Sequence, residues 1–400
     1  MKMNSSKLLF PFLFVGLLFS IMSFTLPRKG ITNTDINKTI SLGPEKQVGQ
    51  NGASTVFSFY STSPESPDGK YIFHLRCKKE PDDKSLLVPG ELWICNHDLK
   101  KYRHLTDVKG MPAHNGAEAQ WLDNKYIALH DSGIIRVIDI RNGKDILKKR
   151  IETPGIGHDS FKGKVLFTVL KENGTERPGI YELNCFTGEV RSVKLITDFR
   201  NAILPSYINP DEVFPVEQWR VLHLQYSPDG KKIAFRLDVG KTEPMQLLGL
   251  CNVDGSDIEI QTRSLHFLWY DNESIIGHIN FNKQGERPQQ EKRFNLTRWD
   301  AKGNYIETLA PRGNHLAISP DRKYFVDETF YQTDPVIMYL ISKEQKNRIT
   351  VIDSFPPYDL VWKKRFHVNP AFSRDGKRIY YSKPLNEKFN GTFYREIKYQ

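Results

Sequence analysis

Histidine is the residue whose number and spacing first indicate chemistry in this sequence. The chain has 11 histidines, and several stand at a similar distance ahead of one recurring turn. His223 lies four residues before Ser227, and His315 lies four residues before Ser319. Six histidines share this placement ahead of a copy of the turn: His114, His158, His223, His266, His315 and His367. Imidazole side chains gathered in one place bind a metal ion or transfer protons near neutral pH.

The recurring turn belongs to a repeated unit of two short strands. Its clearest copy is Leu222–Leu237, in which Ser227-Pro228-Asp229-Gly230 separates the strands. Proline presets φ, aspartate bonds the backbone ahead of it, and glycine takes the left-handed conformation. Seven copies occur, at a spacing of roughly 40 to 65 residues that is typical of a blade-by-blade array. We therefore predict an all-β fold, a closed seven-bladed β-propeller of antiparallel four-stranded blades.

The propeller would bring the histidines together. The strand ahead of the turn is the innermost of its blade, so equivalent positions in different blades face one central funnel. The ring offers ligands for a divalent metal ion (Mn²⁺, Ca²⁺ or Zn²⁺), for which we predict His266, His315 and His367, although nothing in the sequence requires a cofactor. His130 ends a second strand and is expected to face His114 across one hairpin. The alternative for each histidine is a structural hydrogen bond to the neighbouring blade.

Composition narrows the function classes. The 57 Lys and Arg against 47 Asp and Glu give a net charge of +10, spread along the chain rather than in blocks. We therefore predict no nucleic-acid-binding tail. A diffuse positive surface suits any polyanion, including an anionic polysaccharide, and the alternative is that it serves solubility alone. We expect the protein to be a monomer. The four cysteines lie too far apart for a CxxC motif. No GxSxG, HExxH, P-loop or Rossmann fingerprint is present.

The chain divides into three parts. Residues 1–27 contain the uncharged apolar run Leu8–Leu26 after Lys7, which is typical of a signal peptide or a membrane anchor. Residues 28–54 are expected to form a linker, and residues 55–400 the propeller. The protein is therefore predicted to be secreted, or periplasmic and associated with the cell envelope.

The Ser-Pro-Asp-Gly units resemble the repeat of TolB-like propellers over nearly all of residues 56–400. Three stretches resemble the propeller polysaccharide lyases, namely the oligogalacturonate lyases and the ulvan lyases. They are Ala113–Leu122, His223–Phe235 together with His266–Trp269, and His367–Gly376. The resemblance implies a propeller that cleaves a uronate-containing polysaccharide by β-elimination.

The two lyase families imply different residues. Oligogalacturonate lyases use a histidine base at the position of His223, and hold a metal with a histidine matching His266 and a Gln-x-x-His-x-His group. Here that group is Lys364-Arg365-Phe366-His367-Val368-Asn369, so one of its histidines is retained. The resemblance to ulvan lyases instead implies a β-elimination that needs no metal ion and uses two histidines, a tyrosine and an arginine. The residues of this chain near those positions are His114, His130, Tyr181, Tyr207 and Arg200.

Two hypotheses follow. The first is an exported lyase acting on an ulvan-like polysaccharide, with His114, His130 and His223 in proton transfer or carboxylate neutralisation, beside Tyr207 and Arg200. Substrate binding is assigned to Asn115, Trp121, Tyr181 and Trp269, although core packing is the alternative for the aromatic residues. The second hypothesis is a non-catalytic TolB-like propeller that serves as a binding or scaffold module in the cell envelope.

Overall fold

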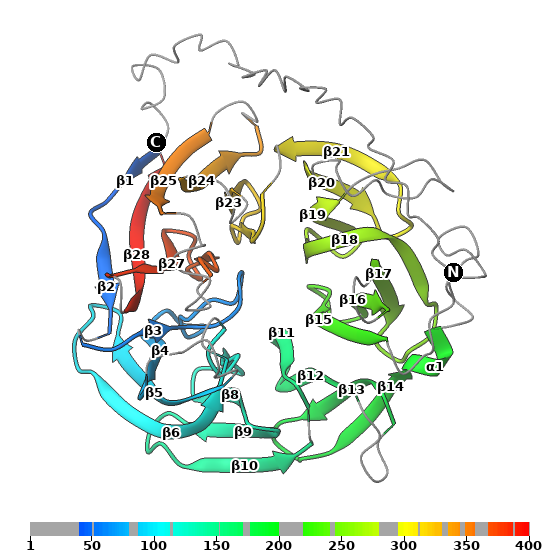
Figure 1. The fold of residues 1–400 in the computed structure, drawn as a ribbon, viewed down its shortest axis with the longest axis horizontal. Coiled ribbons are helices and arrows are strands. Elements are labelled where there is room, and N and C mark those ends of the chain that lie inside the picture. Colours follow the sequence, from blue (N-terminus) through cyan, green and yellow to red (C-terminus); the bar gives the residue numbers. More distant parts are fainter. Residues whose placement is uncertain are drawn as a thin grey trace, which may run out of the picture.

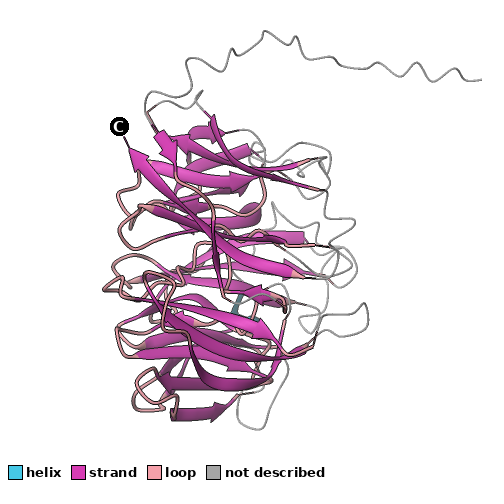
Figure 2. Ribbon diagram, turned by 90° about the vertical axis from the view of Figure 1, so that its left-hand side faces the viewer, coloured by secondary structure: helices cyan, strands magenta, loops and turns pink. Residues whose placement is uncertain are grey.

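Antiparallel blades surround a central axis in the computed structural model (Figure 1), which confirms the predicted seven-bladed β-propeller. The structure describes residues 40–49, 52–79, 87–112, 115–151, 153–170, 177–199, 219–240, 245–279, 295–310, 313–329, 335–344, 349–356, 367–386 and 389–399. From the side, the strands cross the disc from one face to the other and the loops lie on the two faces (Figure 2).

The strands follow one another blade by blade, from the centre outward. The first blade has β3 (Thr55–Val56), β4 (Tyr71–Cys77), β5 (Val88–Asn96) and β6 (Arg103–Met111), and the second has β7 (Gln120–Trp121), β8 (Tyr126–Asp131), β9 (Ile134–Asp139) and β10 (Asp145–Arg150). The third has β11 (Ile156–Phe161), β12 (Lys164–Val169), β13 (Gly179–Asn184) and β14 (Val190–Leu195), followed by the short helix α1 (Ile196–Phe199).

The fourth and fifth blades form one continuous sheet. It contains β15 (Arg220–Tyr226), β16 (Lys232–Val239), β17 (Met245–Asn252), β18 (Glu259–Trp269), β19 (Ser274–Ile279), β20 (Asn295–Asp300) and β21 (Tyr305–Ala310). Strand β18 is the outer strand of the fourth blade where it pairs with β17, and the inner strand of the fifth where it pairs with β19. The sixth blade has β22 (Ala317–Ile318), β23 (Tyr324–Glu328), β24 (Val336–Ser342) and β25 (Ile349–Phe355).

The last blade corrects one predicted boundary. It contains β26 (Ala371–Phe372), β27 (Arg378–Pro384) and β28 (Asn390–Tyr399), and its outer edge is paired with β1 (Ile40–Leu42) and β2 (Lys46–Val48). Residues 40–48 were expected within the linker 28–54, but they close the ring against β28 (Figure 1). The pairing hides an edge that would otherwise be open.

The recurring turn forms as its sequence predicts. In the fourth blade, Ser227 Oγ donates to Asp229 Oδ1 (2.8 Å), Asp229 Oδ1 accepts from the backbone of Lys231 (3.1 Å), and Gly230 has φ +70°. Ser66, Ser319 and Ser373 repeat the serine–aspartate bond at 2.6–2.8 Å. These local bonds end each inner strand at the same point, and so fix the position of the residue four places earlier.

Apolar side chains between adjacent blades form the core. The largest fully buried ones include Trp299, Phe73, Phe167, Phe235 and Phe267. The four cysteines are free and buried. Among the described residues, no helix has the length and apolar character that a membrane crossing requires.

Candidate functional site

Five imidazoles form an arc around the centre of the propeller. The ring centroids of successive members lie 5.0, 5.4, 4.6 and 4.8 Å apart. The five residues, in chain order, are His158, His223, His266, His315 and His367. They come from five consecutive blades, because each precedes the same turn of its blade. We call this group the histidine arc.

The inner strands bend where they carry these side chains. The register of β11 against β12 shifts between Ile156 and Ser160, that of β15 against β16 between Leu222 and Gln225, and that of β18 against β19 between Ser264 and Phe267. His158, His223 and His266 lie within these three irregularities, and His223 has φ +53°. Such bulges re-aim a side chain, here at the cost of a left-handed backbone at His223.

Two aromatic residues of the first blade complete the arc. Phe59 stacks on His158, with ring centroids 4.4 Å apart and an interplanar angle of 7°. Tyr60 lies within the arc, with ring centroids 4.9 Å from His158, 6.1 Å from His223, 5.2 Å from His266 and 5.5 Å from His315. Only 1% of Tyr60 is exposed, so its ring is packed among these four imidazoles.

Hydrogen bonds orient all five imidazoles. His266 Nδ1 lies 2.8 Å from the carbonyl oxygen of Asn314, which only accepts, so Nδ1 carries the proton. His315 Nδ1 lies 2.5 Å from Glu328 Oε1 and donates to this carboxylate. His158 Nε2 is 2.9 Å from His223 Nδ1. Because Nδ1 carries the proton, Nε2 is the acceptor nitrogen of His266 and of His315, and His315 Nε2 lies 3.1 Å from His367 Nδ1.

The arc is held mainly in the uncharged state. Burial lowers the pKa of His158 to about 3, and it lowers the pKa of His223 and of His266 well below the ordinary 6.5. Arg236 on β16 pairs with Leu222, the residue before His223, and its positive charge contributes to all three shifts. Arg236 Nε also lies 2.9 Å from Asp238 Oδ1.

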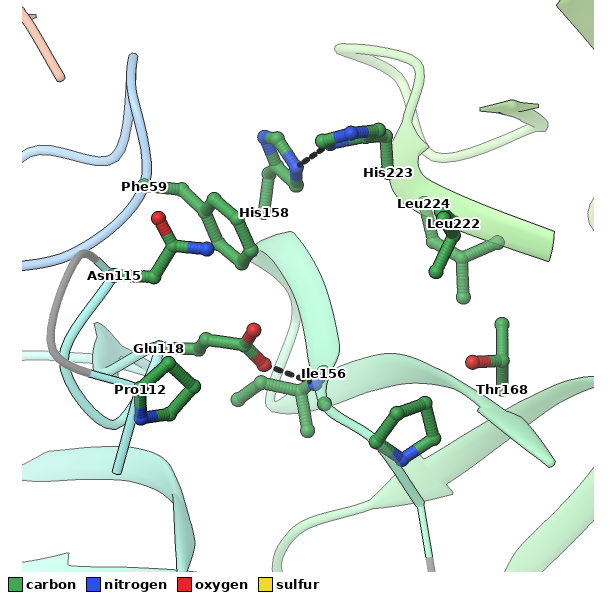
Figure 3. A pocket seen from close by; sticks show the side chains of 12 residues that line it. Phe59, Pro112, Asn115, Glu118, Ile156, His158, Thr168, Leu222, His223 and Leu224 are labelled. Carbon is green, nitrogen blue, oxygen red and sulfur yellow. Dashed lines mark hydrogen bonds between the residues drawn. The ribbon is translucent and has the colours of Figure 1, made fainter. Parts of the chain in front are cut away.

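A pocket of about 310 Å³ opens beside the arc. Its walls come from the first four blades and include Phe59, Glu118, His158, Leu222 and His223, with Asn115 beside them (Figure 3). Gly157 allows β11 to approach β15 closely, because a Cβ there would lie 2.8 Å from Leu224 O. The volume is at the lower end of the range for small-ligand sites.

The donor atoms of the arc suit a divalent transition metal. Neutral imidazoles oriented through a carboxylate or a carbonyl oxygen are the usual form of a histidine metal ligand. Within the part of the chain that the structure describes, however, only Glu91, His104 and Asp107 bring three such ligand atoms within 4.8 Å of one another. Lys78 Nζ occupies that surface cluster, 2.8 Å from Asp107 Oδ2. The side chains of the arc are therefore of the type that binds a divalent metal ion, but no three of their described ligand atoms lie within 4.8 Å of one another.

The residues predicted from the sequence are placed as follows. His223, His266, His315 and His367 belong to the arc, and Asn115 lines the pocket. His130 lies at the end of β8 and accepts a hydrogen bond from the backbone of Gly133 at its Nε2, so it does not join the arc. His114, Arg200 and Tyr207 lie outside the described residues.

The aromatic residues assigned to sugar binding are largely buried. Trp121 is 3% exposed and donates to Pro64 O, and Trp269 is 7% exposed and lies beside Gln225 O. Tyr181 is 5% exposed, stacks on Phe167 and donates to a backbone carbonyl. All three pack in the core, although Trp121 also borders a second pocket of about 210 Å³.

Three residues that sequence reasoning did not select stand at the site: Tyr60, Glu118 and Arg236. For Glu118 a signal was present. The segment Glu118-Ala119-Gln120-Trp121 parallels His223-Leu224-Gln225-Tyr226, with a glutamine in the same place. Tyr60 carried no comparable signal, because its proximity to the arc depends on how the blades pack. Arg236 pairs with Leu222, one residue from His223, in the hairpin that the repeated turn predicts.

Comparisons with known proteins agree with the fold. No family model matches the chain, and no curated protein matches it in sequence. An oligogalacturonate lyase from Vibrio parahaemolyticus is similar in structure, with a TM-score of 0.61 and 11% identity over 89% of this chain and 96% of its own. An oligogalacturonate lyase in complex with manganese gives a TM-score of 0.62 and 13% identity over 90% and 97%.

TolB from Acinetobacter baumannii also matches, with a TM-score of 0.39 and 14% identity over 76% of this chain and 65% of its own. That superposition is too loose to support an argument. At identities this low, the likeness to the two lyases shows a shared propeller fold, and function must be argued from the site.

Proposed function

We propose that this protein is an exported polysaccharide lyase that cleaves a uronate-containing, ulvan-like anionic polysaccharide by β-elimination. The observation that carries the proposal is the placement of His223. Its imidazole lines the pocket on a bulged strand, 2.9 Å from His158, and burial keeps it uncharged. A neutral imidazole at the wall of a pocket is a competent general base. The fold shared with two oligogalacturonate lyases supports this choice of reaction class.

The elimination assigns a role to each group. His223 would take the proton at C5 of the uronate, the C5–H electrons would form the C4=C5 double bond, and the C4–O bond would break. His158 would hold the imidazole of His223 through the bond between their ring nitrogens. The apolar side chains of Phe59, Leu222 and Leu224 line the same pocket and would exclude water from the sugar ring.

The carboxylate of the uronate must also be neutralised, since negative charge develops on it as the C5 proton leaves. Arg236, which pairs with Leu222 one residue from His223, would act in this way. His266, His315 and His367 would hold a divalent metal ion, which when bound supplies further positive charge to the same carboxylate. His114 and His130 are retained as a second pair to be tested, by resemblance to ulvan lyases.

Export completes the proposal. The run Leu8–Leu26 would direct the chain out of the cytoplasm, as a cleaved signal or as a membrane anchor. The net charge of +10 favours contact with an anionic polysaccharide there.

One observation favours a second candidate function, a non-catalytic binding or scaffold module of the cell envelope. Tyr60 is 1% exposed and its ring is packed among four imidazoles of the arc, so a substrate would have to bind beside these rings rather than between them. The pocket of about 310 Å³ provides such a position, which is why we rank the lyase first.

The test is the ultraviolet absorbance of the unsaturated uronate product. The purified protein is incubated with ulvan, pectate, alginate and glycosaminoglycans, with and without chelator. His223→Ala should lower the rate by about 10²–10⁴-fold. His97→Ala, a half-exposed histidine away from the pocket, should leave the rate unchanged. A His114→Ala/His130→Ala double variant tests the alternative pair. No absorbance change on any polymer, with folded protein, would reject the lyase in favour of the binding module.

A further inference from the structure

Glu118 in the second blade occupies the same position as His223 in the fourth. Each stands two residues before a glutamine whose Nε2 donates to the next inner strand, from Gln120 to Gly157 O and from Gln225 to Phe267 O, both at 2.8 Å. Each also has the same left-handed backbone, with φ +50° and +53°. The bend that aims His223 at the pocket therefore aims a carboxyl group at it from another wall (Figure 3).

The carboxyl group of Glu118 has one structural bond and one unused oxygen. Oε2 accepts from the backbone N–H of Ile156 at 2.7 Å, and no other described residue bonds to the group. Glu118 is 6% exposed. The carboxyl group occupies space that a side chain at position 155 would fill, because a Cβ on Gly155 would lie 2.1 Å from Oε2. The side chain is thus fixed in direction while Oε1 is left for a ligand in the pocket.

The surroundings of Glu118 favour its protonated form. None of the described residues that line the pocket is a lysine or an arginine. Burial raises the pKa of Glu118 to about 8, whereas the burial of His223 lowers its pKa. Two groups on one pocket whose environments act in these opposite directions are suited to be an acid and a base at the same pH.

We propose that Glu118 is the general acid of the elimination, donating its proton to the glycosidic oxygen that leaves C4 of the uronate. This inference rests on the proposed function. His223 takes the C5 proton, the C5–H electron pair becomes the C4=C5 double bond, and the C4–O pair remains on the leaving oxygen. The proton of Glu118 then makes that oxygen a hydroxyl group, so the polymer gains a new chain end without releasing an alkoxide. Solvent returns the proton to Glu118 and removes the one on His223.

The first test compares two leaving groups. Glu118→Gln keeps an oxygen that can accept from Ile156 N–H but has no transferable acidic proton. On the polysaccharide, this variant should be slower by about 10²–10⁴-fold. The second substrate is a synthetic uronide that carries a 4-nitrophenoxy group at C4, which leaves as 4-nitrophenolate without being protonated. On this substrate the variant should keep most of the wild-type rate. Glu189→Gln, an exposed residue on the outer turn of the third blade, is the matched control and should be unaffected on both substrates.

Two outcomes would overturn the inference. An equal loss on both substrates would mean that Glu118 supports the pocket and does not transfer a proton. At neutral pH, the infrared spectrum of the wild type should show the carbonyl band of a protonated carboxyl group, and Glu118→Gln should remove this band. Absence of the band from the wild type would also overturn the inference, independently of activity. A wild type that is inactive on every polymer and on the nitrophenyl uronide would instead reject the proposed function, and the acid role with it.

Discussion

The Nδ1 atom of His315 lies 2.5 Å from Oε1 of Glu328, and the side chains are 4% and 0% exposed. The carboxylate fixes both the tautomer and the direction of an imidazole in the histidine arc. Asn314 Nδ2 donates to the same oxygen at 3.0 Å, and the carbonyl of Asn314 accepts from His266. A single pair of neighbouring residues on the sixth blade therefore orients two members of the arc.

Glu328→Gln is expected to weaken metal binding by the arc. Loss of the negative charge makes His315 a poorer ligand, and partners of this kind typically change metal affinity by about 10–100-fold. Calorimetric titration of the metal-free protein with Mn²⁺ measures the effect, with Glu189→Gln as control. Equal affinities in the two variants would contradict the role of Glu328, and absence of binding in the wild type would contradict a metal site in the arc.

Gly155→Ala is expected to displace Glu118. The new Cβ would lie 2.1 Å from Oε2, so either the carboxyl group or the backbone must move, at about 1–3 kcal/mol. The cost should be much smaller in a Glu118→Ala background, where the obstructing side chain is gone. Urea denaturation of the two single variants and the double variant gives the coupling. Additive effects would show that Gly155 is required for another reason.

Glu118 should make stability fall as pH rises from mildly acid to mildly alkaline. Burial raises the pKa of the folded-state carboxyl to about 8, whereas in the unfolded chain it ionises near the ordinary 4.5. Between these values the folded state binds one more proton than the unfolded state, so Glu118 lowers the free energy of unfolding by at most about 1.4 kcal/mol per pH unit. Glu118→Gln should remove this contribution. Urea titrations of both proteins across the window measure it, and parallel pH profiles would contradict it.

The pairing of β1 and β2 with β28 should contribute to stability of the whole ring. Val48 on β2 is 0% exposed and packs in the cluster shared by the first and last blades. Val48→Ala should lower the free energy of unfolding by about 2 kcal/mol through the cavity it leaves. Val351→Ala on β25 is the matched control, since that valine is 55% exposed and its loss should cost under about 0.5 kcal/mol. Equal thermal midpoints for the two variants would mean that residues 40–48 do not hold the ring closed.

The sequence was sufficient for the fold because the signals for it are local. Ser227, Pro228, Asp229 and Gly230 make the turn by bonds within a few residues, and the same types recur in other blades. Once each inner strand ends at that turn, the residue four places earlier is fixed in height along the channel. The arc from His223 to His315 follows from this counting.

The tertiary structure decided what lies between the blades. Strand β1 pairs with β28 across more than 350 residues of sequence, and no local pattern in residues 40–48 specifies that partner. The bulges at His158 and His223 shift the register of their strands by extra residues. The alternation of inward and outward side chains along a regular strand therefore does not predict which side chains enter the pocket. Tyr60 reaches the arc only because different blades pack closely.

The second blade shows both contributions, that of the local sequence and that of the contacts between blades. Counting from the turn pointed to His114, which lies outside the described residues and stays a prediction. Within the described part of this blade, the backbone bends at Glu118, which has φ +50° and lines the pocket. The glutamine two residues later was visible in the sequence, while the direction of the Glu118 carboxyl depends on the backbone of Ile156 and on the space at Gly155 in the next blade. Residue types and their period along the chain thus determined the fold and most of the arc, and contacts between blades determined which carboxyl group and which tyrosine stand beside it.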